Sequence, residues 1–203
     1  MSAPLTIGFV HPAYQLGAEF AARGYPARSF EVRTLDDLKS RIAEADVLVL
    51  SGLWRNDLID LAPKLRFVQS VSAGTDQFDR GRLARARIRL ASAQGANERA
   101  VAEHAMALIL ALSRQLHLAR DHQMSRHWRP MIGDPLRRED ELEGKTLVIV
   151  GLGRIGTRLA GLACAFGMSV IGVRRHPAPS SFADKVIGMS GLREALEGPT
   201  SSP

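Results

Sequence analysis

The stretch LVIVGLGRIG, residues 147–156, places four apolar residues directly before three glycines in the pattern G-x-G-x-x-G. The next residues, Thr157–Phe166, have a helical pattern, and Ser169–Val173 (SVIGV) forms a second apolar run. A glycine pattern between a strand and a helix, inside one β-α-β unit of about thirty residues, is the fingerprint of a dinucleotide-binding fold. The sequence therefore predicts a nucleotide site at residues 151–156. An ordinary glycine-rich turn without a ligand is the alternative.

Each glycine of this loop has a separate physical task. Gly151 permits the tight turn, Gly153 lets the backbone approach a diphosphate, and Gly156 lets the helix lie close to the strand. We expect the main-chain amides of residues 153–156, at the positive end of the helix dipole, to hold the diphosphate.

The end of the second strand indicates which nucleotide fits. About twenty residues after the glycines, an Asp or Glu would bind the adenosine ribose, but this chain has Arg174 and Arg175 there. A guanidinium offers a planar fork of donors to phosphate oxygens. We therefore expect NADP(H) to be preferred over NAD(H), unless the two arginines only face solvent.

Short apolar runs alternate with helical segments in the first ninety residues. The runs are Thr6–Val10, Ser29–Arg33, Val47–Leu50, Phe67–Val71 and Ile88–Ala91, with helical patterns at Gln15–Arg23 and Leu35–Ala45. This alternation is typical of a parallel sheet with helices on its faces. We expect an α/β chain with a flavodoxin-like domain at residues 1–96, followed at 97–203 by an inter-domain helix and the first half of a Rossmann domain.

A long helical pattern begins at Asn97, which is a suitable N-cap. Apolar residues recur on one helix face, and neither Gly nor Pro occurs between Asn97 and Arg129. The sequence predicts one long helix that joins the two domains.

Several segments together resemble the D-isomer-specific 2-hydroxyacid dehydrogenase family. The segments are VSAGTD at 71–76, NERAVAEH at 97–104, Gln123 with Trp128, LEGKT at 142–146 and the glycine loop, and the resemblance spans about Thr6 to Leu196. It implies hydride transfer between a nicotinamide cofactor and a 2-keto or D-2-hydroxy acid. It also implies that Ser72, Ala73 and Gly74 line the substrate pocket, that Arg154 and Ile155 contact the pyrophosphate, and that Val101 lies near the nicotinamide. The loop at 72–74 also fits an ordinary strand-to-turn connection.

The family's catalytic arginine, glutamate and histidine belong to a second half of the dinucleotide domain. After Val173 the sequence offers only a weak strand at Lys185–Ile187 and a short helix at Leu192–Leu196. We therefore assign no catalytic residue and expect a C-terminally truncated chain that is inactive alone. The histidines near the long helix lack the i, i+4 spacing of helical metal ligands, so we predict no metal site.

Composition limits the remaining alternatives. The formal net charge is +6, but the arginines are spread along the chain without a nucleic-acid motif, so we expect no nucleic acid partner. No apolar run reaches the length of about 18 residues that indicates a membrane helix, and the single Cys164, expected in the core, excludes a disulfide framework. We expect a cytoplasmic oxidoreductase that dimerises through the long helix. The alternative is a non-catalytic, dinucleotide-binding or dimerising remnant of such an enzyme.

Overall fold

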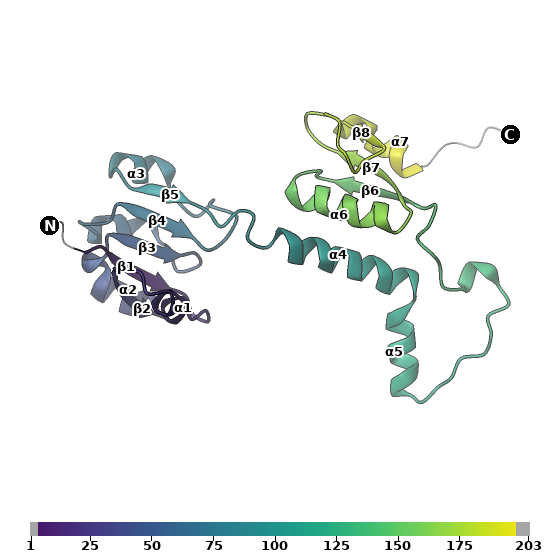
Figure 1. The fold of residues 1–203 in the computed structure, drawn as a ribbon, viewed down its shortest axis with the longest axis horizontal. Coiled ribbons are helices and arrows are strands. Elements are labelled where there is room, and N and C mark those ends of the chain that lie inside the picture. Colours follow the sequence, from purple (N-terminus) through teal and green to yellow (C-terminus); the bar gives the residue numbers. More distant parts are fainter. Residues whose placement is uncertain (1–3, 198–203) are drawn as a thin grey trace. The chain divides into compact units, whose positions relative to one another are not determined.

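The computed structural model describes residues 4–197 and divides into two units, Met1–Ala96 and Asn97–Pro203 (Figure 1). Each unit has its own parallel sheet and its own buried apolar cluster. The two units are therefore described separately.

The first unit is built on a five-stranded parallel sheet. Its strands are β1 (Thr6–Val10), β2 (Arg28–Val32), β3 (Val47–Leu50), β4 (Phe67–Ser70) and β5 (Arg89–Ala91), in the order β2-β1-β3-β4-β5 (Figure 1). This is the flavodoxin-like strand order, and it confirms the fold class that the alternating pattern predicts. In such a sheet the carboxyl ends of the strands share one edge, where ligands bind.

Helices connect these strands. They are α1 (Leu16–Ala22), α2 (Leu35–Arg41) and α3 (Arg80–Arg85), with 3-10 turns at Ile42–Glu44 and Asn56–Leu61. The sequence did not predict α3, because its arginines indicate a charged surface and give no helical pattern of apolar residues. Its signals are local: the carboxylate of Asp79 accepts a hydrogen bond from the amide of Arg82 at 2.9 Å, and Leu83 is buried.

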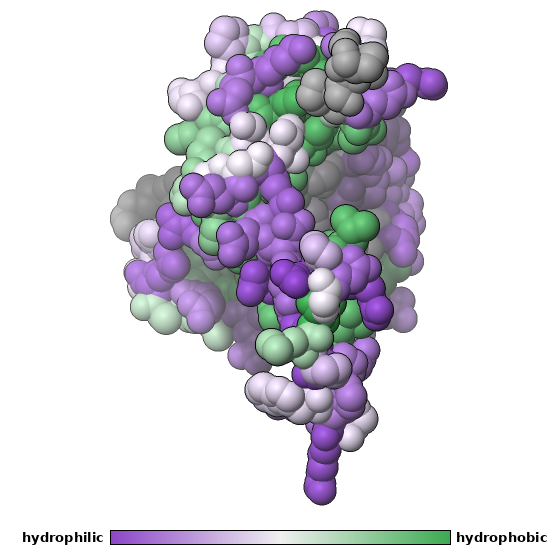
Figure 2. All heavy atoms as spheres, turned by 90° about the vertical axis from the view of Figure 1, so that its right-hand side faces the viewer, coloured by the Kyte–Doolittle hydropathy of each residue, from purple (hydrophilic) through white to green (hydrophobic). Residues whose placement is uncertain are grey.

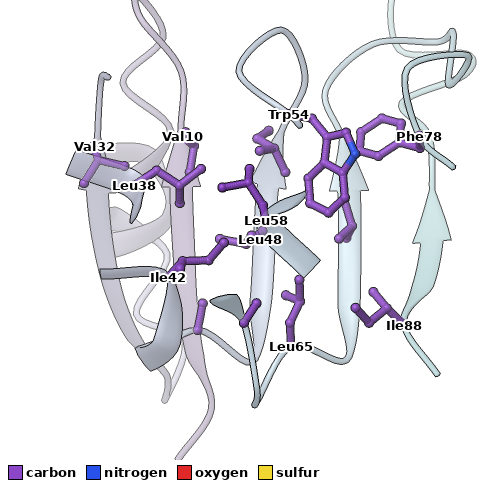
Figure 3. Close-up of a cluster of buried hydrophobic side chains, with 14 of the residues drawn as sticks. Val10, Val32, Leu38, Ile42, Leu48, Trp54, Leu58, Leu65, Phe78 and Ile88 are labelled. Carbon is purple, nitrogen blue, oxygen red and sulfur yellow. The ribbon is translucent and has the colours of Figure 1, made fainter. Parts of the chain in front are cut away.

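The core of the first unit consists of strand residues and the helices that cover them (Figure 3). Leu38, Leu48 and Leu58 are fully buried, and each contributes about 1.5–3 kcal/mol by its removal from water. Trp54 is also buried, with its ring centroid 5.1 Å from that of Phe78. This core holds the carboxyl ends of β3 and β4 in place, where the polar residues of the first unit lie.

The second unit has a three-stranded parallel sheet, β6 (Thr146–Val150), β7 (Ser169–Val173) and β8 (Lys185–Ile187), in sequential order. Helix α6 (Arg154–Ala165) joins β6 to β7, and α4 (Glu98–Ser113) packs on α6 (Figure 1). This is the predicted first half of a Rossmann domain. Met106 of α4 is buried in the same cluster as Ile149, Ala160 and Val170.

The predicted uninterrupted helix from Asn97 to Arg129 is wrong. Helix α4 ends at Ser113, Gln115 has a φ of +49°, and α5 (Leu116–Met124) leaves in a new direction (Figure 1). Hydrogen bonds from a distant segment replace those of a continuous helix. The amide of Asp140 donates to the Ser113 carbonyl at 2.8 Å, and the Gln115 side chain donates to the carbonyls of Arg137 and Arg138, both at 3.1 Å.

Asn97 is the N-cap of α4, as predicted, and its carbonyl accepts the amide of Val101 at 3.0 Å, but its side chain makes no capping hydrogen bond. One smaller expectation in this unit is wrong. Cys164 is exposed rather than in the core, because the inner face of α6 is formed by Gly156, Ala160 and Ala163. Its thiol contacts the Phe182 carbonyl at 3.5 Å.

The far side of the second sheet is partly covered by the short helix α7 (Leu192–Glu197), which follows a 3-10 turn at Met189–Gly191. A groove of about 270 Å³ remains between Ile171 and Ile187 of the sheet and Ala195 of α7. Figure 2 shows apolar side chains (green) at the level of these elements, at the top of the view. Within residues 4–197, no helix has both the length and the apolar character needed to cross a bilayer.

Candidate functional site

The glycine loop leads from the carboxyl end of β6 into α6 and lies beside the carboxyl end of β7. Gly151 follows β6 with a φ of +100°, a conformation that L side chains rarely adopt. The amides of Gly151 and Leu152 donate to the Val173 carbonyl, at 2.9 and 3.3 Å, and the amide of Gly153 donates to the Gly151 carbonyl at 2.9 Å. The turn is therefore held against the last residue of β7.

The two other glycines meet different surroundings. A Cβ on Gly156 would lie 2.3 Å from the Gly151 carbonyl oxygen and 3.2 Å from the Ile149 side chain. A Cβ on Gly153 would have no neighbour within 4 Å. Gly156 thus permits the close contact between helix and turn, and Gly153 leaves open space in front of the helix start.

Three amides at the start of α6 are available to an anion. Those of Arg154, Ile155 and Gly156 precede the first helical hydrogen bond, in which the Thr157 amide donates to the Gly153 carbonyl at 2.8 Å. They donate to no acceptor among residues 4–197. The amides of residues 153–156 were all expected to hold the diphosphate, but the Gly153 amide already donates to the Gly151 carbonyl within the turn. Three amides therefore remain. Three aligned amides at the positive end of a helix can hold a phosphate or diphosphate.

The side chain of Arg154 makes a contact that the sequence did not predict. Its guanidinium pairs with the carboxylate of Glu98 at 3.2 Å, and Arg158 reaches the same carboxylate at 3.5 Å. The Glu98 side chain is only 13% exposed. The pair joins the first turn of α4 to the first turn of α6, so Val101, one turn further along α4, lies at the same end of the unit as the glycine loop. Fifty-six residues separate the partners, and no local pattern indicates the contact.

Arg174 and Arg175 directly follow Val173, the residue that anchors the glycine turn. The amide of Arg174 donates to the Ile187 carbonyl at 3.0 Å, which fixes the start of this pair beside β8. Arg174 is half-buried and Arg175 is exposed. Neither guanidinium forms an ion pair within the described part of the chain, so both can bind an anionic group.

The first unit has a polar loop at the carboxyl end of β4. Ser72, Ala73 and Gly74 are exposed, and the amides of Ala73 and Gly74 donate to no acceptor in residues 4–197. The Ser72 amide is already used, because it donates to the Ser70 hydroxyl at 3.2 Å. Consecutive free amides of this kind can bind a carboxylate.

Two buried hydroxyls support this loop, and the sequence did not identify either. Ser70 Oγ donates to the Ser72 carbonyl at 3.1 Å, and Ser51 Oγ lies 2.6 Å from Ser72 Oγ. The Gln77 side chain donates to Ser51 Oγ at 3.3 Å. Ser51 ends no recognisable motif; it simply follows β3, whose neighbour in the sheet is β4. Only the strand order brings it to this loop.

The histidines lie elsewhere. His11 accepts the amides of Ala13 and Tyr14 through Nδ1, at 3.1 and 2.8 Å, and the rings of His122 and His127 lie 4.8 Å apart. Among residues 4–197, no histidine contacts a carboxylate, and no cluster of His, Cys, Asp or Glu has the arrangement of a metal site. The described residues therefore provide anion-binding donors but no paired acid–base group.

Comparison with known proteins supports this reading of the second unit. Residues 106–198 match the family model described as D-isomer specific 2-hydroxyacid dehydrogenase, NAD binding domain. The chain is 37% identical over 146 residues to a glyoxylate reductase of Aeropyrum pernix, and 32% identical over 164 residues to a D-3-phosphoglycerate dehydrogenase of Mycobacterium tuberculosis. These matches cover 67% and 79% of the chain.

A solved structure matches both units. It is a D-isomer specific 2-hydroxyacid dehydrogenase family protein from Aeromonas salmonicida, with a TM-score of 0.80 and 25% identity over 96% of this chain. The match covers 61% of that protein. The two curated relatives are covered over 42% and 30% of their lengths, so the chain spans less than half of each.

The contact at Gly156 makes a prediction about stability. Gly156→Ala places a methyl group against the Gly151 carbonyl, so we expect the free energy of unfolding of the second unit to fall by about 1–3 kcal/mol. Gly161→Ala in the same helix is the matched control. Its Cβ would meet the Phe182 ring at an ordinary 3.7 Å, and removing a helical glycine stabilises by about 0.5–1 kcal/mol.

Urea unfolding followed by circular dichroism measures both variants. We expect unfolding midpoints that move in opposite directions from that of the unsubstituted chain. Equal midpoints for the two variants would show that the helix and the turn do not depend on this contact.

Proposed function

The chain belongs to the D-isomer specific 2-hydroxyacid dehydrogenase family, and from that premise we propose that it binds NADP(H) and serves an oxidoreductase of 2-keto and 2-hydroxy acids. In such a reaction the nicotinamide supplies or accepts the hydride. The residues of this chain bind and orient the two anionic partners. The proposal includes a cytoplasmic setting, which the unpaired Cys164 supports.

The single observation that carries the proposal is the row of amides at Arg154, Ile155 and Gly156. They begin a twelve-residue helix directly behind a strand and a glycine turn, and they have no acceptor among the described residues. Gly153 leaves the approach to them open, since apart from its own chain neighbours no atom lies within 4 Å of where its Cβ would be. A diphosphate is the anion whose charge and size suit such a helix start.

The preference for NADP(H) rests on the two arginines after β7. In dinucleotide-binding folds this position contacts the adenosine ribose, and a carboxylate there selects the free 2′-hydroxyl. Arg174 and Arg175 instead supply two guanidiniums without ion-pair partners in residues 4–197. The 2′-phosphate of NADP(H) can accept charge-assisted hydrogen bonds from these guanidiniums. NAD(H) has no 2′-phosphate and lacks these bonds.

We assign the substrate carboxylate to the loop of Ser72, Ala73 and Gly74. Two of its amides are free of acceptors in the described chain, and the loop sits at the carboxyl edge of a parallel sheet, where ligands of such folds bind. Which 2-keto acid binds depends on the rest of the pocket, and family membership alone does not determine it.

Proton transfer at the substrate carbonyl needs a titratable group near neutral pH, usually a histidine held by a carboxylate. No histidine in residues 4–197 has a carboxylate partner, which supports the proposal that this chain alone binds the cofactor without turning it over. Val101, beside the glycine-loop end of the unit, remains our candidate for contact with the nicotinamide.

A dimerising role is the second candidate, and it rests on exposed apolar side chains. They are Leu108, Leu112, Leu116, Met124, Trp128, Met131 and Leu136, of which Trp128 is 96% and Met131 98% exposed. Next to them, α5 and residues 129–139 line a cavity of about 640 Å³, and the ion-paired Arg129 and Glu139 are part of this lining. Apolar groups gathered in this way usually mark an interface. We propose a homodimer through α4, α5 and the segment after them.

Titration calorimetry tests cofactor binding. We expect NADPH to bind the chain at least about tenfold more tightly than NADH, since charge-assisted hydrogen bonds to the extra phosphate favour it. Replacing Arg174 and Arg175 together by serine should remove this preference and leave the affinity for NADH unchanged. Arg193→Ser, an exposed arginine of α7, is the control. Equal dissociation constants for the two cofactors would remove the NADP preference, and no heat from either cofactor would remove the dinucleotide site.

Turnover is the second measurement. With glyoxylate, pyruvate or hydroxypyruvate and NADPH, we expect the chain to give no consumption of the reduced cofactor above the rate without protein. The absorbance of the reduced nicotinamide monitors this. A rate that rises in proportion to the protein concentration would contradict the proposal and require an acid–base group within the chain.

Sedimentation velocity tests the dimer. We expect a sedimentation coefficient that rises with concentration, and a shift to monomer when Trp128 and Met131 are both replaced by serine. Tyr14→Ser, at a residue 55% exposed in the first unit, should change nothing. A single monomeric species at the highest concentration reached would exclude the interface.

A further inference from the structure

The only buried polar residues among residues 4–197 are two serines, and both serve the same loop. Ser51 is 7% exposed and Ser70 fully buried. Ser51 directly follows β3, and Ser70 is the last residue of β4, the neighbouring strand. Both side chains form hydrogen bonds with Ser72. A buried hydroxyl without a partner is costly, so each hydrogen of these groups needs an acceptor.

Ser70 acts on the backbone of the loop. Its Oγ accepts the Ser72 amide at 3.2 Å and donates to the Ser72 carbonyl at 3.1 Å. The Ser72 carbonyl also accepts the amide of Ala93 at 3.2 Å, and the Val71 amide donates to Leu50. Hydrogen bonds to its amide and its carbonyl therefore fix the main chain of Ser72. The direction in which the Ser72 hydroxyl points its hydrogen depends on Ser51.

The burial of Ser51 determines the direction of its hydrogen bond to Ser72. Ser51 Oγ has two partners, the Gln77 amide nitrogen at 3.3 Å and Ser72 Oγ at 2.6 Å. In the orientation in which the Gln77 amide lies in this structure, its nitrogen faces Ser51 Oγ and can only donate, so Ser72 Oγ is the acceptor for the Ser51 hydrogen. If Ser72 donated to Ser51 instead, the Ser51 hydrogen would be buried without a partner. Ser51 therefore donates, and the hydrogen of Ser72 is left free.

We infer that Gln77 and Ser51 are positioning residues that set the Ser72 hydroxyl as a donor to the substrate carboxylate. The relay runs from the Gln77 amide to Ser51 Oγ, from the Ser51 hydroxyl to Ser72 Oγ, and from the Ser72 hydroxyl to the ligand. A carboxylate only accepts hydrogen bonds. It is therefore attracted when the Ser72 hydroxyl points its hydrogen toward the ligand, and repelled when the Ser72 lone pairs face the ligand. The inference rests on the proposed function of the loop, and it adds a third donor to the amides of Ala73 and Gly74.

The polarity of the relay can be reversed without removing a side chain. In Gln77→Glu a carboxylate replaces the donating amide in the same shape. The Ser51 hydroxyl then donates to Glu, Ser72 donates to Ser51, and the lone pairs of Ser72 face the ligand. Adding Ser51→Ala to Gln77→Glu breaks the relay, and the Ser72 hydroxyl is again free to turn toward the ligand. A simple repulsion between the new charge and the ligand would persist in this double variant.

The experiment is a titration of the full chain with oxamate, an analogue of 2-keto acids, followed by amide chemical shifts. The unsubstituted chain should show saturable shifts at Ala73 and Gly74. We expect Gln77→Glu to weaken oxamate binding about tenfold or more, in line with the loss of a hydrogen bond to a charged acceptor. The double variant Ser51→Ala/Gln77→Glu should return to within about threefold of the unsubstituted chain. Gln123→Glu, on α5 of the other unit, controls for added charge, and the amide spectrum reports that every variant is folded.

The outcomes separate the inference from the proposed function. Unchanged affinity in Gln77→Glu overturns the relay, and so does a double variant that binds as weakly as Gln77→Glu alone. In both cases the loop remains a carboxylate site held by its amides. If the unsubstituted chain gives no shifts with oxamate at Ala73 and Gly74, the carboxylate site itself fails, and the relay fails with it.

Discussion

The approach of Gly156 to the Gly151 carbonyl is the contact on which the second unit depends. At this point the first turn of α6 lies so close to the end of β6 that no side chain fits between them. The approach aligns the amides of Arg154 and Ile155 with the turn, and it orients the helix so that Ala160 and Ala163 face Ile149 and Val170. Because Gly156 has no side chain, the helix can pack closely against the sheet and present its row of free amides.

In the function proposed here, the two units would bind their two anions by the same physical means, namely backbone amides that have no acceptor within the described residues. In the second unit the donors are amides that a helix start leaves without acceptors, and the helix dipole adds positive potential. In the first unit the donors are amides of a short loop, and no helix of useful length stands behind them. Instead, the buried hydroxyls of Ser51 and Ser70 hold the loop, which fits a group that must be oriented rather than only attracted. Backbone donors suit both sites because the fold already fixes their positions. Little conformational entropy is therefore lost when an anion binds.

The parts of the fold that could be predicted from the sequence are those whose signals are local. The strands β1, β3, β6 and β7 follow from continuous apolar runs, and the glycine loop follows from its spacing. The prediction failed where distant segments compete with local preference. The helix pattern continues through Gln115, yet α4 ends at Ser113, whose carbonyl accepts the Asp140 amide, and the Gln115 side chain donates to the carbonyls of Arg137 and Arg138. The exposure of Cys164 was likewise missed, because a residue's type does not reveal which helix face is covered.

The sequence by itself determined where the turn, the helix start and the strand ends lie along the chain, because glycine spacing and apolar periodicity act within a few residues. It also determined that two arginines, and no carboxylate, follow β7. Only the tertiary structure decided which side chains meet: Glu98 with Arg154, and Ser51 with Ser72 and Gln77. Those contacts join residues 21 to 56 positions apart, and parallel strand order and helix packing, which no local pattern encodes, bring them together.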